Sequence, residues 1–303
     1  NTNTSTATSC HQLATSNLAL FLNPTAVLTL GDNQYESGTL AQFQTYYHPN
    51  WGRLNGIVYP VPGNHEYNTG GAAGYFSYFN SVLTPRGATA TDPTKGYYSF
   101  DIGLWHIIAL NSEVSTGGGS VQEQWLRADL VSHPVDCTLA YWHKPRFSSG
   151  TNHGNNTNMQ ALWQALYDNR ADIVLNGHEH NYERFALQTP TGLADSVNGV
   201  REFVAGMGGK NLYPFGNPKP QSEVRNNTSF GVLKLILHPT NYNWEFVKDD
   251  ANHTLLDSGS ASCVGLNQSS GMKQLLTRYL ANDQLYEFNH DGKVNALDFA
   301  ASI

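Results

Sequence analysis

Charged residues are scarce in this chain of 303 residues: Asp, Glu, Lys and Arg make up 14% of it, and the net charge is −7. A mildly acidic chain of this kind is a poor partner for nucleic acid, because binding to phosphate backbones needs clustered lysine and arginine. Long apolar runs are also absent. None reaches the roughly 20 residues that a transmembrane helix needs, so we expect no membrane span.

Cysteine is rarer still, with three residues: Cys10, Cys137 and Cys263. None belongs to a C-x-x-C pair, which argues against a thiolate metal site. The chain has no start methionine and no signal sequence, as expected of a mature or trimmed product. Several Asn-x-Ser/Thr sequons are present, for example at Asn155 and Asn252. These features favour a protein that is secreted or displayed at the cell surface.

Four short β-prone runs are each followed by a polar loop. They are "AVLTL" before "GDNQY", "IVYPVP" before "GNHEY", "TLAYW" before "HKPRF", and "DIVL" before "NGHEH". Apolar runs of this length suit strands that are covered on both faces. Helical patterns lie between them, at 8–22, after a capping Ser120, and at 158–168. The alternation predicts an α/β fold, a layered β-sandwich flanked by helices.

Metal-ligand side chains stand where these four runs end. In layered α/β folds, ligands bind beyond the carboxyl ends of strands. The residues are Asp32 with Tyr35, Asn64 with His65, His143, and His178 with His180. A single histidine after a strand usually has a structural role. The simpler interpretation of His178 and His180 is a pair of surface histidines on a turn. Four such endings instead indicate a site for iron, zinc or manganese, in which a carboxylate can bridge two cations.

"GDNQY", "GNHE", the His of "YWHKP" and "GHEHNYER" resemble, in order, four of the five motif blocks of the calcineurin-like metallophosphoesterases. The tyrosine of "GDNQY" and the form "GHEHNYER" resemble the purple acid phosphatase branch of that family. The resemblance covers roughly residues 10–262. It implies a phosphatase with a binuclear metal site that hydrolyses phosphomonoesters by attack of a metal-bound hydroxide.

Carried over residue by residue, the resemblance implies a role for each side chain. Asp32 would bridge the metals; Tyr35 and His180 would bind Fe(III). A divalent ion (Zn, Mn or Fe) would be bound by Asn64, His143 and His178. His65 and, less specifically, His153 would be the catalytic residues that face the substrate.

The family's first block, an Asp at the end of the first core strand, has no counterpart before Asp32. We expect an upstream segment that carries this Asp, and also a cysteine that pairs with Cys10. Cys137 opens a predicted core strand and Cys263 closes the last strand region, so we expect a disulfide between them. If no upstream segment exists, the ferric site lacks a ligand.

The end of the chain has a chemistry of its own. "EFNHDGKVNALD" fits a calcium loop with oxygen ligands at positions 1, 3, 5 and 12 and Gly at position 6. Its ligand positions are Glu287, Asn289, Asp291, Lys293, Asn295 and Asp298. "GKVNALD" resembles a dockerin repeat, which implies a cohesin-like or cell-surface partner; a polar C-terminal turn is the plainer reading.

We therefore divide the chain into a metallophosphoesterase domain (1–264), a linker (265–271) and a dockerin-like, EF-hand-like module with a small helical calcium-loop tail (272–303). The Gly/Ser-rich composition that suggests the linker begins at Asp257. The expected function is a secreted phosphatase acting on phosphate esters. Two alternatives stay open: a phosphodiesterase or nucleotidase on the same scaffold, and a catalytically dead binding or structural protein.

Overall fold

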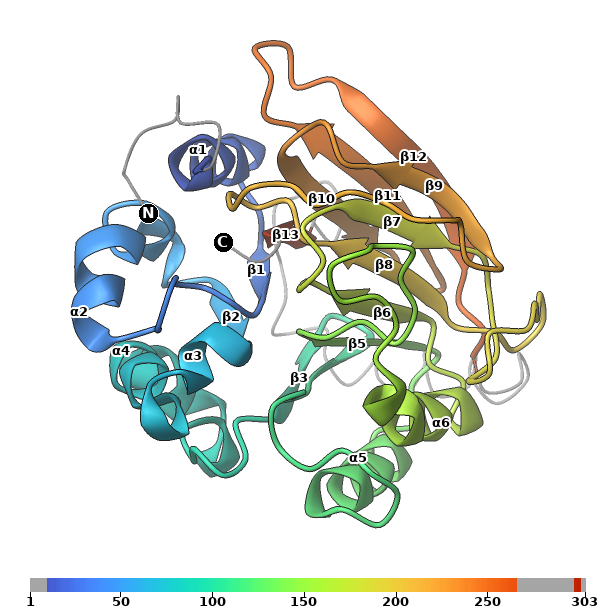
Figure 1. Ribbon diagram of the computed structural model, residues 1–303. Helices are drawn as coiled ribbons and strands as arrows, with labels where there is room; N and C mark the ends of the chain where they lie inside the picture. The colour runs from blue at the N-terminus through green and yellow to red at the C-terminus, as the bar shows by residue number, and fades with distance from the viewer. Residues whose placement is uncertain (1–9, 266–296, 301–303) are drawn as a thin grey trace.

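The computed structural model describes residues 10–265 and the backbone of 297–300. Two β-sheets form the centre of this part of the chain (Figure 1). The six-stranded sheet has the order β12-β11-β10-β13-β1-β2, and the seven-stranded sheet has the order β3-β4-β5-β6-β8-β7-β9. Together with the flanking helices they make the layered α/β sandwich that the sequence predicts.

The six-stranded sheet combines strands from both ends of the chain. Parallel pairs join β1 to β2 and to β13, while β10, β11 and β12 form antiparallel pairs. The strand bounds are β1 Ala26–Leu30, β2 Val58–Val61, β10 Gly231–Leu237, β11 Asn241–Lys248, β12 Leu255–Ser262 and β13 Leu297–Ala300.

The seven-stranded sheet has a parallel centre, β4-β5-β6-β8, with antiparallel strands at both edges. The strand bounds are β3 Tyr98–Ile102, β4 Trp105–Ala109, β5 Cys137–Trp142, β6 Ile173–Asn176, β7 Tyr182–Phe185, β8 Arg201–Ala205 and β9 Ser222–Asn226. Strands β1, β5 and β6 are buried along their whole length, as their apolar runs predict.

The helices lie on the outer faces of the sheets and in the connection between β1 and β3. The helices are α1 Gln12–Leu22, α2 Leu40–Gln42, α3 Asn64–Tyr67, α4 Ala73–Leu83, α5 Val121–Ser132 and α6 Gln160–Asp168. Short 3-10 or π turns are η1 Phe43–Tyr47, η2 Trp51–Leu54, η3 Gly70–Ala72, η4 Thr84–Arg86, η5 Ala88–Ala90 and η6 Thr157–Met159. Ser120 caps α5 as expected, because its side chain accepts the N–H of Glu123.

Two hydrophobic cores hold the layers together. One lies between the sheets and contains Leu28, Val61, Leu139 and Leu235 among its buried residues. The other lies under α5 and α6 against the outer face of the seven-stranded sheet, and includes Trp142 and Trp163. Burial of these side chains is the main force that fixes the strands, and with them the loops at the strand ends. No helix in the described part of the chain is long and apolar enough to span a bilayer.

The structure tests three sequence expectations about the end of the chain, of which one is confirmed and two are wrong. Cys137 and Cys263 form a disulfide. The linker-like interpretation is wrong for residues 257–262, because they form most of β12, whose small residues pair with β11 along a sheet edge. A helical tail is wrong for Leu297–Ala300, because this segment forms β13, whose backbone pairs with β1 on one side and β10 on the other. The other predicted calcium-loop residues, Glu287, Asn289, Asp291, Lys293 and Asn295, lie outside the described residues, as does most of the predicted module.

Candidate metal centre

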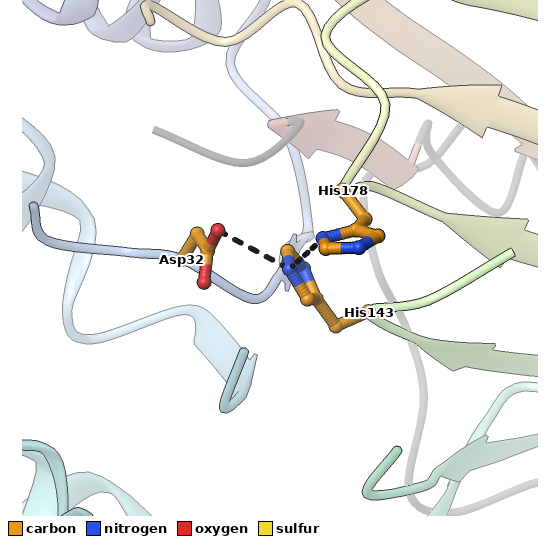
Figure 2. Close-up of side chains that lie close together, drawn as sticks. All are labelled: Asp32, His143 and His178. Carbon is orange, nitrogen blue, oxygen red and sulfur yellow. Dashed lines mark hydrogen bonds and ion pairs between the residues drawn. The ribbon is translucent and has the colours of Figure 1, made fainter. Parts of the chain in front are cut away.

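The loops that follow β1, β2, β5 and β6 meet at one edge of the sandwich. They bring together all six side chains that the sequence singles out as metal ligands: Asp32, Tyr35, Asn64, His143, His178 and His180. Four of them, Asp32, Tyr35, His143 and His180, are almost completely enclosed. Contact distances between the polar atoms of the six side chains lie near 3 Å. Asp32, His143 and His178 form a group whose ligand atoms lie within 4.8 Å of one another (Figure 2).

Asp32 lies at the centre of this cluster. Its Oδ2 atom is 3.2 Å from the His143 Nε2 atom on one side and accepts a hydrogen bond of 3.2 Å from the Tyr35 hydroxyl on the other. Its Oδ1 atom accepts the backbone N–H of His65. The φ of Asp32 is 50°, in the left-handed region that non-glycine residues seldom adopt. One carboxylate therefore faces two groups of ligands.

The first group contains His143, Asn64 and His178. The His143 Nε2 atom is 3.1 Å from Asn64 Oδ1 and 3.0 Å from His178 Nδ1, while its Nδ1 atom bonds to the carbonyl of Leu30. Because a backbone carbonyl can only accept, Nδ1 carries the proton, and the Nε2 lone pair is left for a cation. Three nitrogen or oxygen donors and the Asp32 carboxylate thus converge on one point.

The second group contains Tyr35 and His180. The Tyr35 hydroxyl is 2.9 Å from His180 Nε2, and His180 Nδ1 bonds to the carbonyl of Asn211. His180 also stacks on Tyr213, with ring centroids 3.9 Å apart. This arrangement again leaves the outward nitrogen of the imidazole for a cation. This second group has only Tyr35 and His180 besides the shared Asp32, whereas the first group has three side chains besides it. Among the described residues, no further carboxylate joins the second group.

Burial and neighbouring charges set the ionisation of these groups. Burial alone would raise the pKa of Asp32, but the adjacent His143 holds that pKa well below its usual range. Burial and the nearby His143 lower the pKa of His178, and burial lowers the pKa of His180 to about 4. Both imidazoles are therefore neutral near pH 7, which is the state that binds metals. Burial and Asp32 raise the pKa of Tyr35, so the phenol ionises only where a cation offsets that cost.

The two residues expected to face the substrate lie beside the cluster; His65 is half-buried and His153 is exposed. His65 has its Nε2 atom 3.9 Å from Asp32 Oδ2, and its Nδ1 atom bonds to the carbonyl of Glu36. The His153 ring stacks on the His178 ring, with centroids 3.8 Å apart. Both imidazoles thus lie next to the ligand cluster.

Sequence reasoning missed two buried glutamates within the quoted motifs. Glu66 of "GNHE" accepts the backbone N–H groups of Asp32, Gln34 and Gly63. Glu179 of "GHEH" accepts those of His153 and Gly154. Each carboxylate holds a loop that carries a site residue. Their place between or beside the histidines of each motif was the signal that could have revealed them.

A second His/Asp group lies away from this cluster. His106, Asp129 and His133 also have ligand atoms within 4.8 Å of one another. The two imidazole rings are stacked nearly parallel, 4.2 Å apart at 11°. Because nitrogen lone pairs lie in the ring plane, stacked rings cannot both direct a lone pair at one ion. This group is better described as a buried hydrogen-bond network.

A layered α/β sandwich with a buried carboxylate facing two sets of nitrogen and oxygen donors, all beyond the ends of strands, defines the class of metallophosphoesterases. The chain belongs to the calcineurin-like phosphoesterase family, which it matches over residues 11–182. Residues 202–258 match a second family, described as iron/zinc purple acid phosphatase-like protein C. The resemblance to the family's motifs is confirmed, whereas the comparisons do not show the dockerin-like repeat.

Individual relatives support this assignment. Purple acid phosphatase 15 of Arabidopsis thaliana is 32% identical over 146 residues, which are 44% of this chain and 27% of that protein. An uncharacterised protein of Mycobacterium tuberculosis, Rv2577, is 28% identical over 183 residues, 50% of this chain and 35% of the relative. The chain thus spans less than half the length of these curated relatives.

Solved structures show the same fold. A purple acid phosphatase from yellow lupin seeds superimposes with a TM-score of 0.69 at 20% identity, covering 83% of this chain and 49% of the lupin chain. GAP50, the anchor in the inner membrane complex of Plasmodium, superimposes with a TM-score of 0.62 at 13% identity, covering 96% of this chain and 95% of its own. At these identities the likeness concerns the fold alone.

Proposed function

We propose that this protein is a metal-dependent phosphatase that hydrolyses phosphate monoesters in the manner of the purple acid phosphatases. The observation that carries the proposal is the position of Asp32. Its Oδ2 atom contacts both His143 Nε2 and the Tyr35 hydroxyl at 3.2 Å, so one carboxylate faces both groups of donors. A carboxylate shared by two cations is the central element of a two-metal hydrolytic site.

The donor set fits the metals that the resemblance implies. Asn64, His143 and His178 would hold a divalent ion (Zn, Mn or Fe), Tyr35 and His180 would hold Fe(III), and Asp32 would contact both. Phenolate and carboxylate oxygens suit the harder ferric ion, and imidazole suits zinc, iron or manganese. The neutral state of His178 and His180 supports this assignment, since a protonated imidazole cannot bind a cation.

Bound cations would supply Lewis-acid charge for the phosphoryl oxygens. They would also lower the pKa of water, so that hydroxide is available near neutral pH to attack phosphorus. The chain's own contribution is to place proton donors around that position. His65 is fixed by its backbone hydrogen bond to Asp32 and by the Glu36 carbonyl at Nδ1. Its Nε2 atom faces the cluster, where the ring, when both nitrogens carry a proton, can donate to the leaving oxygen. His153, held by Glu179, would bind a phosphoryl oxygen.

The ferric half is where the described residues supply too few donors. Asp32, Tyr35 and His180 are present, and the family's first-block Asp has no counterpart among residues 10–32. We propose that this carboxylate comes from a segment before Asn1. Cys10 itself is buried, and its backbone pairs with that of Lys210 near the site.

A catalytically dead binding protein is the second candidate, and the short donor set at Tyr35 and His180 is the observation that favours it. Metal analysis and turnover of p-nitrophenyl phosphate by the full-length protein separate the two. Two metal ions per chain and steady turnover are expected. A protein that binds at most one ion and does not hydrolyse the ester would refute the phosphatase. Faster turnover of bis-p-nitrophenyl phosphate would instead favour the phosphodiesterase alternative.

We further propose that the protein works outside the cytoplasm, as its Cys137–Cys263 disulfide supports. The C-terminal calcium loop and its cohesin-like partner stay proposals based on the sequence. Calcium at millimolar concentration should protect 287–298 from proteolysis, since weak extracellular sites bind at about 10⁻⁴–10⁻³ M. Asp291→Ala should remove that protection, and equal cleavage with and without calcium would rule the loop out.

A further inference from the structure

A cavity of about 560 Å³ lies at the end of strand β2 remote from the metal centre. Its walls come from the turn before β2, the end of α4, and η4. The lining residues are Asn55, Gly56, Tyr59, Ser81, Val82, Pro85 and Arg86. Asn55 and Gly56 precede β2, whereas the metal-centre residues Asn64 and His65 follow it. The volume falls within the roughly 300–1,000 Å³ typical of small-molecule sites. We call it the Arg86 cavity.

Arg86 is a cation with no carboxylate partner and no hydrogen-bond acceptor among the described residues. Its Nε atom is buried and makes no hydrogen bond. Its guanidinium carbon lies 4.0 Å from the centroid of the Tyr59 ring. This contrasts with Arg127 on α5, which pairs with both Glu123 and Asp168. An unpaired, partly buried guanidinium is unusual in a chain of net charge −7.

The guanidinium of Arg86 lies over a pair of stacked aromatic rings. The Tyr59 ring stacks on Phe100, with centroids 3.9 Å apart at 16°. Tyr59 belongs to β2 and Phe100 to β3, which are edge strands of the two different sheets. The stack therefore joins the sheets beneath the guanidinium.

Asn55 supplies a second unsatisfied polar atom. Its Nδ2 atom donates to the Tyr78 hydroxyl at 3.1 Å, but its Oδ1 atom is buried without a hydrogen-bond partner. Buried polar atoms are nearly always satisfied in native proteins, so each orphan calls for a partner. The cavity is thus lined by one cationic side chain and one amide, with apolar surface on Tyr59, Val82 and Pro85.

We propose that the Arg86 cavity binds a small organic oxyanion. The guanidinium of Arg86 would pair with a carboxylate or a phosphate, because its planar fork matches both groups. The apolar body of the same molecule would lie on Tyr59. This site is separate from the metal centre and does not depend on hydrolysis.

The test uses two probes, 4-hydroxybenzoate for the carboxylate and phenylphosphonate for the phosphate, titrated into the metal-loaded full chain by calorimetry. His178→Ala provides a background with the metal centre disabled, so binding that persists there is remote from that centre. Arg86→Gln should weaken this remaining binding by roughly tenfold or more, since charge-assisted hydrogen bonds are lost. Arg127→Gln, a matched change of a paired arginine, should leave it unchanged. The stronger of the two probes identifies the oxyanion.

A second variant fills the cavity without touching the cation. A Cβ added at Gly56 meets no atom within 4 Å, so Gly56→Leu should fold normally and block the probes. Hydrolysis of p-nitrophenyl phosphate should be unchanged in both Arg86→Gln and Gly56→Leu. The proposal is overturned if neither probe binds at millimolar concentration, if binding disappears in His178→Ala, or if both cavity variants bind as the parent does.

Discussion

The carboxylate of Glu66 accepts the backbone N–H of Asp32 at 2.9 Å. The same carboxylate accepts the N–H of Gly63 at 2.7 Å and that of Gln34 at 3.0 Å. Glu66 is fully buried, so one side chain ties the loop after β1 to the loop after β2. It also supports the left-handed backbone of Asp32, which has φ 50°. The position of the shared carboxylate thus depends on a residue that need not touch a metal.

We predict that Glu66→Gln weakens metal binding by roughly 10–100-fold, the usual effect of changing a group that orients ligands. The amide places an N–H where a backbone N–H now points, so one of the three hydrogen bonds becomes a repulsive contact. Metal titration followed by p-nitrophenyl phosphate turnover measures the effect. Glu123→Gln on α5 serves as the control for a carboxylate that accepts an N–H far from the site. Unchanged metal affinity in Glu66→Gln would contradict this role.

Direct ligands and proton donors should give different defects. His178→Ala or Asn64→Ala should lose both bound metal and turnover, because each removes a donor atom from the group around His143. His65→Ala should keep the metals and reduce turnover by roughly 10²–10⁴-fold, the range for a proton-transfer group. His48→Ala, which changes an exposed imidazole, is the control. Full turnover with two metals in His178→Ala would show that the ligand assignment is wrong.

If Tyr35 binds ferric iron, the protein should show a visible phenolate-to-iron absorption band. Tyr35→Phe should abolish the band, because phenylalanine has no oxygen to bind the ion. Tyr213→Phe should retain it, since Tyr213 stacks on His180 and its oxygen is not needed. An active, colourless enzyme that contains only zinc or manganese would refute the iron assignment but not the proposed phosphatase activity.

The sequence predicted the strands that carry the site better than the rest of the sheets. β1 has the expected bounds, and β5 and β6 differ from the expected bounds by one residue at their ends. Short, wholly apolar runs predict such strands well, because they favour a position in which both faces of the strand are buried. The motif histidines then converge because β5 and β6 are parallel neighbours in one sheet, and their ends lie beside the loops that follow β1 and β2 of the other sheet. What the sequence did not reveal is which carboxylates hold the loops. Glu66 and Glu179 stand beside the motif histidines in the sequence, but their hydrogen bonds to the loops depend on burial, which is set by the whole fold.

The place of β13 also lay beyond sequence reasoning. In the described part of the chain, β13 is the only strand that joins β1 to β10, and so links the two halves of the six-stranded sheet. Its segment reads equally well as the end of a calcium loop, because Asp298 fits position 12. Strand pairing over a separation of more than 200 residues leaves no local pattern. Similarly, the edge strand β12 is rich in serine and glycine and resembles a linker until its partner β11 is known.

His106 provides a pH-dependent contribution to stability away from the metal centre. Its ring is almost fully buried and bonds through Nδ1 to Asp101 and through Nε2 to Asp129, both at 2.8 Å. Both nitrogens must donate, so the ring is an imidazolium between two carboxylates. Burial alone would lower the pKa of His106, but the hydrogen bonds to Asp101 and Asp129 outweigh it and raise that pKa. The stacked ring of His133 and the hydroxyl of Ser99, which donates to Asp129, complete its surroundings.

Because the folded pKa of His106 lies above the unfolded value of about 6.5, its contribution is fully present below pH 6.5 and is lost as the pH rises through the folded pKa. We predict that His106→Asn lowers the free energy of unfolding by roughly 1.5–3 kcal/mol at pH 6, the value of a charge-assisted hydrogen bond, and by less at pH 9. Urea unfolding of both proteins at the two pH values measures the difference, and comparing variant with parent cancels the titration of the metal-centre histidines. His48→Asn, at an exposed site, should change neither value. An equal loss at both pH values would mean that His106 is neutral in the folded protein and that packing alone explains its effect.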